Sequence, residues 1–300
     1  MPHTYTHNAR IASKFRDLRL RNEGALIAYL TGWDPTPQGF QSNAEALVEG
    51  GADILEVGIP FSDPIADGPV IQTSSHRALS RGATPSRIFQ QVRKLSKTTD
   101  VPIVLLTYYN PVLACGLDDF MRAAETSGVN GVVIPDLPAE ESGQLVQAAK
   151  NHHVDTIFVI SPNTSPERAK IILDKSRGFL YLVSLFGVTG PRSRLGRTAV
   201  RTVQRVKKLA RNEIPIAAGF GISKPEHVSA LIQAGADGAI VGSALVEIVN
   251  QDIDRPEAMR TRLLDFVLQL KAATKFKAER SLRQTKPRKP NPEYPTSARA

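Results

Sequence analysis

The 300-residue sequence has a single cysteine, Cys115, and six histidines that show no metal-ligand spacing. One cysteine excludes a disulfide within the chain and favours a reducing compartment, so we expect a cytoplasmic protein. With one thiol and no histidine pattern, we expect no metal centre. No apolar run approaches the roughly 18 residues of a membrane helix, which excludes a membrane-spanning protein of that kind.

The chain also has little net positive charge outside its C-terminal end. Its net charge is +9, but residues 271–300 hold nine Lys or Arg and two acids, which leaves about +2 for the preceding 270 residues. The tail contains four prolines and almost nothing apolar after Leu282, so we expect disorder from about residue 280. A solubilising or vestigial tail is favoured over loose attraction to RNA or acidic proteins, and no specific nucleic-acid partner is expected.

The N-terminal segment, residues 1–22, lacks the hydrophobic region of a secretory signal. It is basic and poor in acids, which is also compatible with a transit peptide. Ile11, Phe15 and Leu18 share one helical face, however, and this spacing favours a short amphipathic helix that covers apolar surface.

Short apolar, β-branched runs alternate with helical stretches along the rest of the chain. The eight predicted strands are 25–31, 53–58, 102–109, 131–136, 155–161, 179–184, 214–221 and 238–243. Strands that are apolar on both faces and alternate with helices indicate a parallel sheet. Eight such units in about 250 residues predict an α/β protein with a (β/α)8 TIM barrel at 23–275, followed by the tail at 276–300. The alternative is a doubly wound sheet, but its first βα turn would require a GxGxxG motif that is absent here.

Three helix-to-strand joints repeat one pattern, in GGADILEVG, SGVNGVVIPD and QAGADGAIVGS. Each has a glycine that suits a helix C-cap and an Asp or Asn that suits the turn into the next strand. This repetition supports a fold built from similar βα units.

The most informative stretch is EVGIPFSDPIADGP at 56–69, where Glu56 lies inside a buried strand. A structural acid with a local partner is one interpretation. Burial also raises the pKa of a carboxyl towards a useful acid–base range. Asp67 lies on the following loop, so the two carboxyls in different surroundings form a candidate acid/base pair. Asp63 could join them as a metal ligand, but nothing else nearby is a natural ligand for a hard cation.

The last two predicted strands end in GFGIS (219–223) and VGSALVEI (241–248). Barrels often bind a phosphate with the loops after these strands and a helix N-terminus, where backbone N–H groups approach the anion. Ordinary turn glycines are the alternative. The candidate phosphate-binding residues are Gly190, Gly221, Gly242, Ser243 and Ala244.

These motifs carry a family resemblance. The acidic loop, preceded by ALIAYLTGWDP and followed by YLVSLFGVTG, GFGIS and VGSALV, resembles the tryptophan synthase alpha subunit from about residue 14 to about residue 270. The resemblance implies retro-aldol cleavage of indole-3-glycerol phosphate to indole and glyceraldehyde 3-phosphate, without metal or cofactor. It further implies an α2β2 heterotetramer with a pyridoxal-phosphate beta subunit, which receives the indole for tryptophan synthesis.

The resemblance also implies roles for individual residues. Glu56 matches the glutamate that protonates indole C3 and takes the hydroxyl proton, and Asp67 matches the aspartate that binds the indole N–H. Thr189 matches a lid threonine that meets this aspartate. The matching indole-pocket positions are Tyr29, Leu106, Tyr108, Tyr181 and Phe220. The positions that match the surface facing the beta subunit are Pro60, Asp63, Asn110 and Pro138.

The chain departs from the family pattern at two places. Leu185 and Phe186 follow Ser184 where many members have an arginine, so Arg192 or Arg194 would have to supply any such contact. Trp33 replaces a small residue before Asp34, and we expect it to reshape the mouth of the barrel. Two other functions stay open: a stand-alone lyase that releases free indole, and a catalytically idle barrel that acts as an allosteric partner.

Overall fold

The computed structural model describes residues 10–183, 197–210 and 213–276. The two candidate site residues Thr189 and Gly190 lie outside these ranges. So do Leu185, Phe186, Arg192, Arg194 and nearly all of the predicted tail. No helix in the described part of the chain is both long and apolar enough to cross a membrane.

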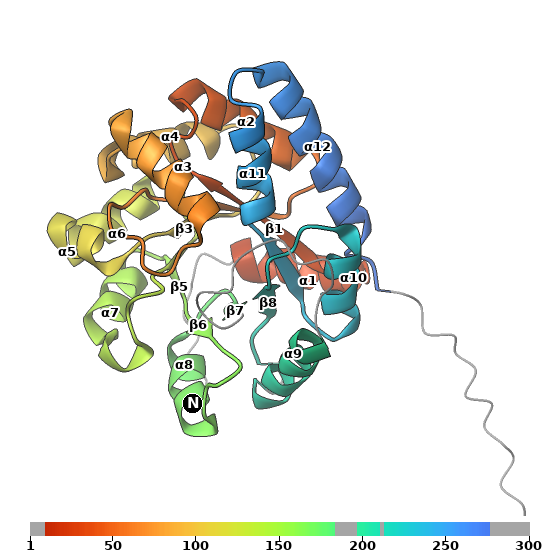
Figure 1. Cartoon of the computed structure of the whole chain (residues 1–300). Coiled ribbons are helices and arrows are strands. Elements are labelled where there is room, and N and C mark those ends of the chain that lie inside the picture. The colour runs from red at the N-terminus through yellow and green to blue at the C-terminus, as the bar shows by residue number, and fades with distance from the viewer. Residues whose placement is uncertain (1–9, 184–196, 211–212, 277–300) are drawn as a thin grey trace, which may run out of the picture.

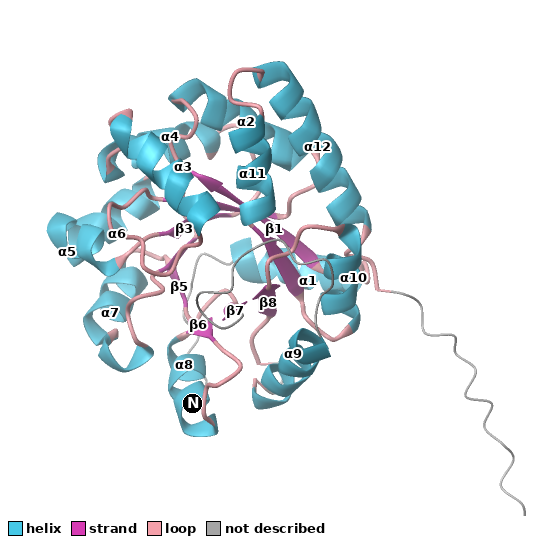
Figure 2. Cartoon of the chain, in the orientation of Figure 1, coloured by secondary structure: helices cyan, strands magenta, loops and turns pink. Residues whose placement is uncertain are grey.

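The described strands form one parallel sheet (Figure 2). They are β1 (Ala25–Thr31), β2 (Ile54–Gly58), β3 (Ile103–Leu106), β4 (Gly131–Val133), β5 (Asp155–Ile157), β6 (Val159–Ile160), β7 (Leu180–Val183), β8 (Ile216–Gly219) and β9 (Gly238–Val241). Every predicted strand is present, although most are shorter at the C-terminal end. For example, the predicted strand 102–109 ends before Tyr109, which begins a helix. The Tyr109 N–H donates to the Asp136 carboxylate at 2.9 Å instead of to a neighbouring strand.

Helices surround these strands on the outside (Figure 1). They are α1 (Arg10–Leu20), α2 (Pro37–Glu49), α3 (Pro69–Ser80), α4 (Pro85–Leu95), α5 (Tyr109–Cys115), α6 (Leu117–Thr126), η1 (Ala139–Glu141), α7 (Gly143–Asn151), α8 (Pro166–Lys175), α9 (Arg197–Leu209), α10 (Pro225–Gln233), α11 (Ser243–Gln251) and α12 (Pro256–Ala272). Proline occupies the first turn of several of them, where its missing N–H costs no helical hydrogen bond.

The sheet closes on itself through the single predicted strand 155–161. The strand order is β5-β4-β3-β2-β1-β9-β8-β7-β6, and only Phe158 separates β5 from β6 in sequence. The first part of this segment pairs with β4 and the second part pairs with β7. The predicted (β/α)8 barrel is therefore confirmed, and the doubly wound alternative is wrong.

The three repeated helix-to-strand joints have the same structural role. Gly51, Gly128 and Gly235 have positive φ values of 95°, 83° and 104°, as a left-handed C-cap requires. Two residues later, the side chains of Asp53, Asn130 and Asp237 accept the N–H of Leu26, Ile103 and Ile216 at 2.8–2.9 Å. Each joint thus ends a helix and also satisfies an N–H at the start of a neighbouring strand.

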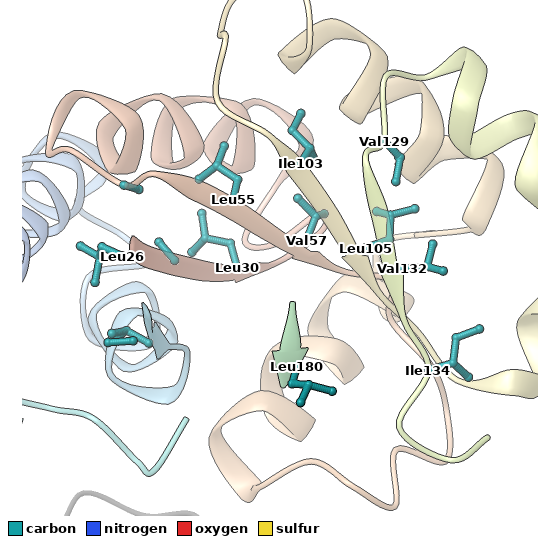
Figure 3. Packing of buried hydrophobic residues seen from close by; sticks show 14 of the residues in the cluster. Leu26, Leu30, Leu55, Val57, Ile103, Leu105, Val129, Val132, Ile134 and Leu180 are labelled. Atoms are coloured by element: carbon teal, nitrogen blue, oxygen red, sulfur yellow. The ribbon is translucent and has the colours of Figure 1, made fainter. Parts of the chain in front are cut away.

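The larger hydrophobic core lies between the barrel and its helices. Leu55 and Val57 of β2 point to this side and pair in register with Ile103 and Leu105 of β3 (Figure 3). Because side chains alternate along a strand, the residues between them, such as Glu56, point into the barrel.

A second core fills the amino-terminal end of the barrel interior. Ile27, Ile54, Val104, Val133 and Ile240 face one another there, and Ile11, Phe15 and Leu18 of α1 pack against them. The predicted covering helix is therefore confirmed, and it seals one end of the barrel (Figure 1). In the described part of the chain, the opposite end of the barrel, at the carboxyl ends of the strands, is therefore the one left open to a ligand.

Candidate active site

The second core ends near the carboxyl ends of the strands. There, polar side chains replace apolar ones inside the barrel. Tyr29 of β1 and Glu56 of β2 are Cα partners in the parallel ladder, one alternation above the apolar pair Ile27 and Ile54. Both therefore point into the barrel beneath its mouth. The sequence pattern predicts this position for Glu56, since it alternates with residues of the outer core.

Glu56 is only 1% exposed. Its Oε2 accepts a long hydrogen bond of 3.4 Å from the Tyr181 hydroxyl of β7, and its Oε1 has no partner within the described residues. Burial raises the pKa of Glu56 to about 8, the Tyr181 hydrogen bond opposes this shift, and the Asp67 charge adds to it. Glu56 is thus a buried acid that holds its proton at neutral pH and has one oxygen free.

Asp67 lies on the loop between β2 and α3 and is partly exposed. Burial raises its pKa to about 6, while the Tyr108 hydroxyl stabilises the carboxylate. The same hydroxyl accepts the Ala66 N–H at 3.0 Å, and the Asp67 carbonyl accepts the Gln72 side-chain N–H at 2.9 Å. The two carboxyls therefore differ in charge near neutral pH, with Asp67 ionised and Glu56 protonated.

A cavity occupies the mouth of the barrel. Its wall is mostly apolar, and among the described residues Asp67 is the one acid that lines it. The lining residues are Tyr29, Ala66, Asp67, Gly68, Ile71, Leu106, Val133, Pro135, Val159, Tyr181, Val183, Gly219, Gly221, Ile222, Ile240, Gly242 and Ser243. Glu56 lies behind this wall, next to Tyr29 and Tyr181, so its carboxyl must turn to reach a ligand. Such a cavity suits a flat aromatic group at one end and a polar group at the other.

Three of the predicted indole-pocket residues, Tyr29, Leu106 and Tyr181, line this cavity. Tyr108 is buried behind the acidic loop and holds that loop through Ala66 and Asp67. Phe220 packs against the outer core instead of lining the cavity. The sequence analysis missed Val133, Val159 and Ile240, although alternation along each strand identifies them as inward-facing.

The predicted phosphate-binding residues come together at the ends of β8 and β9. Gly221, Gly242 and Ser243 line the cavity, and Ala244 lines an adjoining pocket with Gly221 and Ser243. Gly221 has a φ of 65°, which favours glycine. α11 begins at Ser243, and the first N–H groups of a helix have no partner within it, so they are available to an anion.

Trp33 does not reshape this cavity. Its indole N–H donates to the Arg81 carbonyl at 3.1 Å, and the Arg87 guanidinium lies 5.6 Å from its ring centroid. Trp33 lines a separate groove between α2 and α4. The expectation that it alters the barrel mouth is therefore wrong, because the side chain turns outward.

A buried ionic network that the sequence analysis did not identify braces the two halves of the site. Arg77 of α3 binds both Asp34 oxygens, at 2.6 and 2.7 Å, and donates to the Asn250 side chain of α11 at 2.7 Å. It thereby connects α3, the helix after the acidic loop, to α11, the helix that begins at the predicted phosphate-binding residues. Only spatial proximity reveals this link, because its members are far apart in the sequence.

The predicted partner-facing residues lie on the same rim. Asp63 and Asn110 are exposed and Pro138 is partly exposed, whereas Pro60 is buried. Two apolar side chains that were not predicted are also exposed here: Ile65 on the acidic loop, at 82%, and Leu113 on α5, at 50%. The Tyr108 hydroxyl ties the two segments together, so these residues belong to one surface.

The buried acid has a consequence for stability that can be measured. Because burial raises the pKa of folded Glu56 to about 8, the unfolded chain releases this proton first as pH rises. Wild-type stability should therefore fall from the ordinary carboxyl range up to about pH 8. Glu56→Gln removes the ionisation, so thermal unfolding should show a higher Tm than wild type at about pH 8.5. Each kcal/mol gained adds about 2–4 °C.

At about pH 5 the two proteins should differ much less, because this pH is close to the ordinary carboxyl pKa and the unfolded chain gains little by releasing the Glu56 proton. A Tm difference that is independent of pH would show that the carboxyl does not titrate as the structure indicates.

Comparison with known proteins finds relatives of this chain in one family. The family model "Tryptophan synthase alpha chain" matches residues 15–275. A tryptophan synthase alpha chain from Methanoregula boonei is 44% identical over 253 residues, which is 84% of this chain and 95% of the relative.

Solved structures agree with this assignment. Tryptophan synthase from Mycobacterium tuberculosis superposes with a TM-score of 0.81 at 35% identity, covering 89% of this chain and 99% of that one. The tryptophan synthase α2β2 complex from Pyrococcus furiosus gives a TM-score of 0.75 at 41% identity, covering 83% and 98%.

Proposed function

The chain belongs to the tryptophan synthase alpha chain family, and we propose that Glu56 and Asp67 carry out the family's reaction in it. That reaction is the retro-aldol cleavage of indole-3-glycerol phosphate to indole and glyceraldehyde 3-phosphate, a carbon–carbon lyase activity. The observation that carries the proposal is the buried Glu56 carboxyl, with a pKa of about 8 and an unpartnered Oε1.

Glu56 supplies the acid and then the base. Its protonated carboxyl turns towards the cavity and donates a proton to C3 of the indole ring. The resulting carboxylate takes the proton of the hydroxyl on the adjacent side-chain carbon. The bond between C3 and that carbon then breaks, its electron pair restores the aromatic ring, and the hydroxyl oxygen becomes the aldehyde oxygen. Glu56 ends protonated, as it began, so it acts as a general acid and base.

Asp67 stabilises the charge that this protonation creates. Proton transfer to C3 leaves a positive charge that is shared with the ring nitrogen, whose N–H then becomes a strong donor. The Asp67 carboxylate on the cavity wall can accept that hydrogen bond, and such charge-assisted bonds are the stronger kind. Its lower pKa, about 6, keeps it ionised when Glu56 is protonated.

The phosphate cup orients the substrate for these steps. We propose that Gly221, Gly242, Ser243 and Ala244 hold the phosphate through backbone N–H groups, and that Gly190 contributes from the preceding loop. The chemistry uses only proton transfers by side chains, so we propose that this chain itself requires no cofactor and no metal. Thr189 is proposed to meet Asp67 when substrate is bound. A cytoplasmic location is part of the proposal and is favoured by the single cysteine.

The partner is the tryptophan synthase beta subunit, which carries pyridoxal phosphate and converts the indole to tryptophan in a heterotetramer. We propose that the exposed rim formed by Asp63, Ile65, Asn110, Leu113 and Pro138 contacts it. Exposed apolar side chains beside polar ones are typical of such interfaces. Pro60 would then support the loop from below.

The other two interpretations have less support. An idle barrel would not need a buried Glu56 with a free oxygen behind the wall of an apolar cavity. A stand-alone lyase would share the chemistry, but Ile65, at 82% exposure, favours a partner surface. An indole-formation assay with and without the beta subunit separates the three cases: no indole indicates an idle barrel, and an unchanged rate on mixing indicates a stand-alone lyase.

The two pKa values predict the pH dependence of kcat/KM. Activity requires Asp67 ionised and Glu56 protonated, so kcat/KM should fall below about pH 6 and above about pH 8. The substrate phosphate also titrates near pH 6. The control is therefore Asp67→Asn. This variant should be slower, and the part of the fall in kcat/KM at acidic pH (the acidic limb) that Asp67 causes should disappear. Identical acidic limbs in both proteins would assign that limb to the substrate alone.

A further inference from the structure

Tyr29 ends a chain of buried hydroxyl groups. Its hydroxyl lies 3.2 Å from Thr31 Oγ1, which lies 2.6 Å from Ser74 Oγ. Ser74 in turn donates to the Ile71 carbonyl at 2.8 Å. Within the described residues, Thr31 is the only hydrogen-bond partner of the Tyr29 hydroxyl.

The direction of this chain follows from counting protons. Each hydroxyl has one hydrogen, and a carbonyl can only accept. Ser74 donates to Ile71, so all three bonds form together only if Thr31 donates to Ser74 and Tyr29 donates to Thr31. The Tyr29 hydroxyl proton is therefore used in the hydrogen bond to Thr31. Burial and the nearby Asp67 carboxylate raise its pKa further, so the group stays protonated. Its oxygen can only accept another hydrogen bond.

The Tyr29 residue lies between the two ends of the substrate site. In the sheet, β1 separates β9, which ends at the phosphate cup, from β2, which carries Glu56. A Cβ added to Gly242 would lie 3.5 Å from Tyr29 Cβ, so the base of the tyrosine side chain adjoins the cup, whereas its hydroxyl lies against Gly58 at the end of β2. Tyr29 is 4% exposed, lines the cavity and is the ladder partner of Glu56.

A substrate that spans from the cup to Glu56 must therefore pass Tyr29. In indole-3-glycerol phosphate, the connecting segment has three carbons. The first bears the hydroxyl that Glu56 deprotonates, the middle one bears a second hydroxyl, and the third bears the phosphate. The middle hydroxyl is the remaining donor on this segment.

We propose that the Tyr29 oxygen accepts a hydrogen bond from this middle hydroxyl and makes the site selective for a hydroxylated three-carbon chain. Tyr29 is then a specificity-determining residue with a polar role, in addition to forming part of the aromatic wall. The inference rests on the proposed function, because it uses that substrate and the positions of its two ends.

The test compares two substrates with the wild-type protein and Tyr29→Phe. One substrate is indole-3-glycerol phosphate, and the other is 3-hydroxy-3-(indol-3-yl)propyl phosphate, which has hydrogen in place of the middle hydroxyl. Both release indole, so one assay measures both kcat/KM values. Wild type should prefer the natural substrate by about 2- to 12-fold more than Tyr29→Phe does, the range expected for a neutral hydrogen bond. Tyr29→Phe should therefore lose less kcat/KM on the deoxy substrate than on the natural one, because only the natural substrate loses this hydrogen bond.

The matched control is Tyr108→Phe, which removes a hydroxyl from the loop anchor beside the same site. It should slow both substrates by the same factor and keep the wild-type preference. If Tyr29→Phe also slows both substrates equally, Tyr29 has only a structural role and the proposal is overturned. Failure of wild type to release indole from the natural substrate would instead overturn the proposed function.

Discussion

Replacing Glu56 by glutamine is expected to lower kcat for indole formation by at least about 10²- to 10⁴-fold, the usual contribution of a positioned acid/base. Glutamine has nearly the same shape and can keep a hydrogen bond with Tyr181, but it neither donates a proton to C3 nor removes one from the hydroxyl. Substrate affinity should change little, since Glu56 lies behind the cavity wall. Steady-state kinetics and equilibrium binding of the substrate would measure the two effects separately.

Asp155→Asn provides a matched control for this substitution. Asp155 is also buried, and burial raises its pKa to about 7. It lies at the first position of β5, at the opposite end of the barrel from the cavity. This variant should retain turnover. If Glu56→Gln kept more than a tenth of the wild-type kcat, Glu56 would not be the acid/base.

Loss of the phosphate interaction is the second large effect that we expect. Hydrogen bonds to a charged group contribute about 1.5–3 kcal/mol each, so two backbone donors correspond to about 10²- to 10⁴-fold in kcat/KM. Indole-3-glycerol without phosphate should be a correspondingly poor substrate. Gly242→Val should cause a loss in the same range with the natural substrate, because its methyl groups extend towards the space that the phosphate occupies.

Gly242→Ala separates this effect from damage to the fold. A Cβ at position 242 makes only ordinary contacts, the nearest at 3.5 Å to Tyr29, so alanine should be tolerated and lose much less activity. The two variants and wild type should act alike on the substrate without phosphate. Equal wild-type activity on both substrates would remove the phosphate cup from the mechanism.

The fold was predictable because its signals are local. Apolar β-branched runs mark the eight strands, and their spacing identifies a parallel barrel. The face shared by Ile11, Phe15 and Leu18 predicts a covering helix, since three-residue and four-residue spacings place side chains on one side of a helix. The joint glycines were recognisable for the same reason: the left-handed conformation at Gly51 is a property of one residue.

Part of the active site could also be predicted from the sequence, because a carboxylate is unfavourable within an apolar strand. Alternation alone turns Glu56 into the barrel, between the outward-facing Leu55 and Val57. The Pro- and Gly-rich loop that follows then brings Asp67 to the carboxyl end of the barrel, where Glu56 lies. The roles that we propose for them, as an acid and an anion, rest on their burial, which the flanking residues already suggest.

The tertiary structure decided everything that depends on contacts between distant segments. The sequence by itself determined the strands, the covering helix and the two carboxyls, each from neighbouring residues. Folding decided that the Tyr108 hydroxyl anchors the acidic loop, that Trp33 turns outward, and that Arg77 joins the neighbouring helices α3 and α11. It also set the direction of the hydroxyl chain from Tyr29. The physical reason is that hydrogen bonds and burial depend on where side chains meet in space, and barrel closure brings together residues that no local pattern relates.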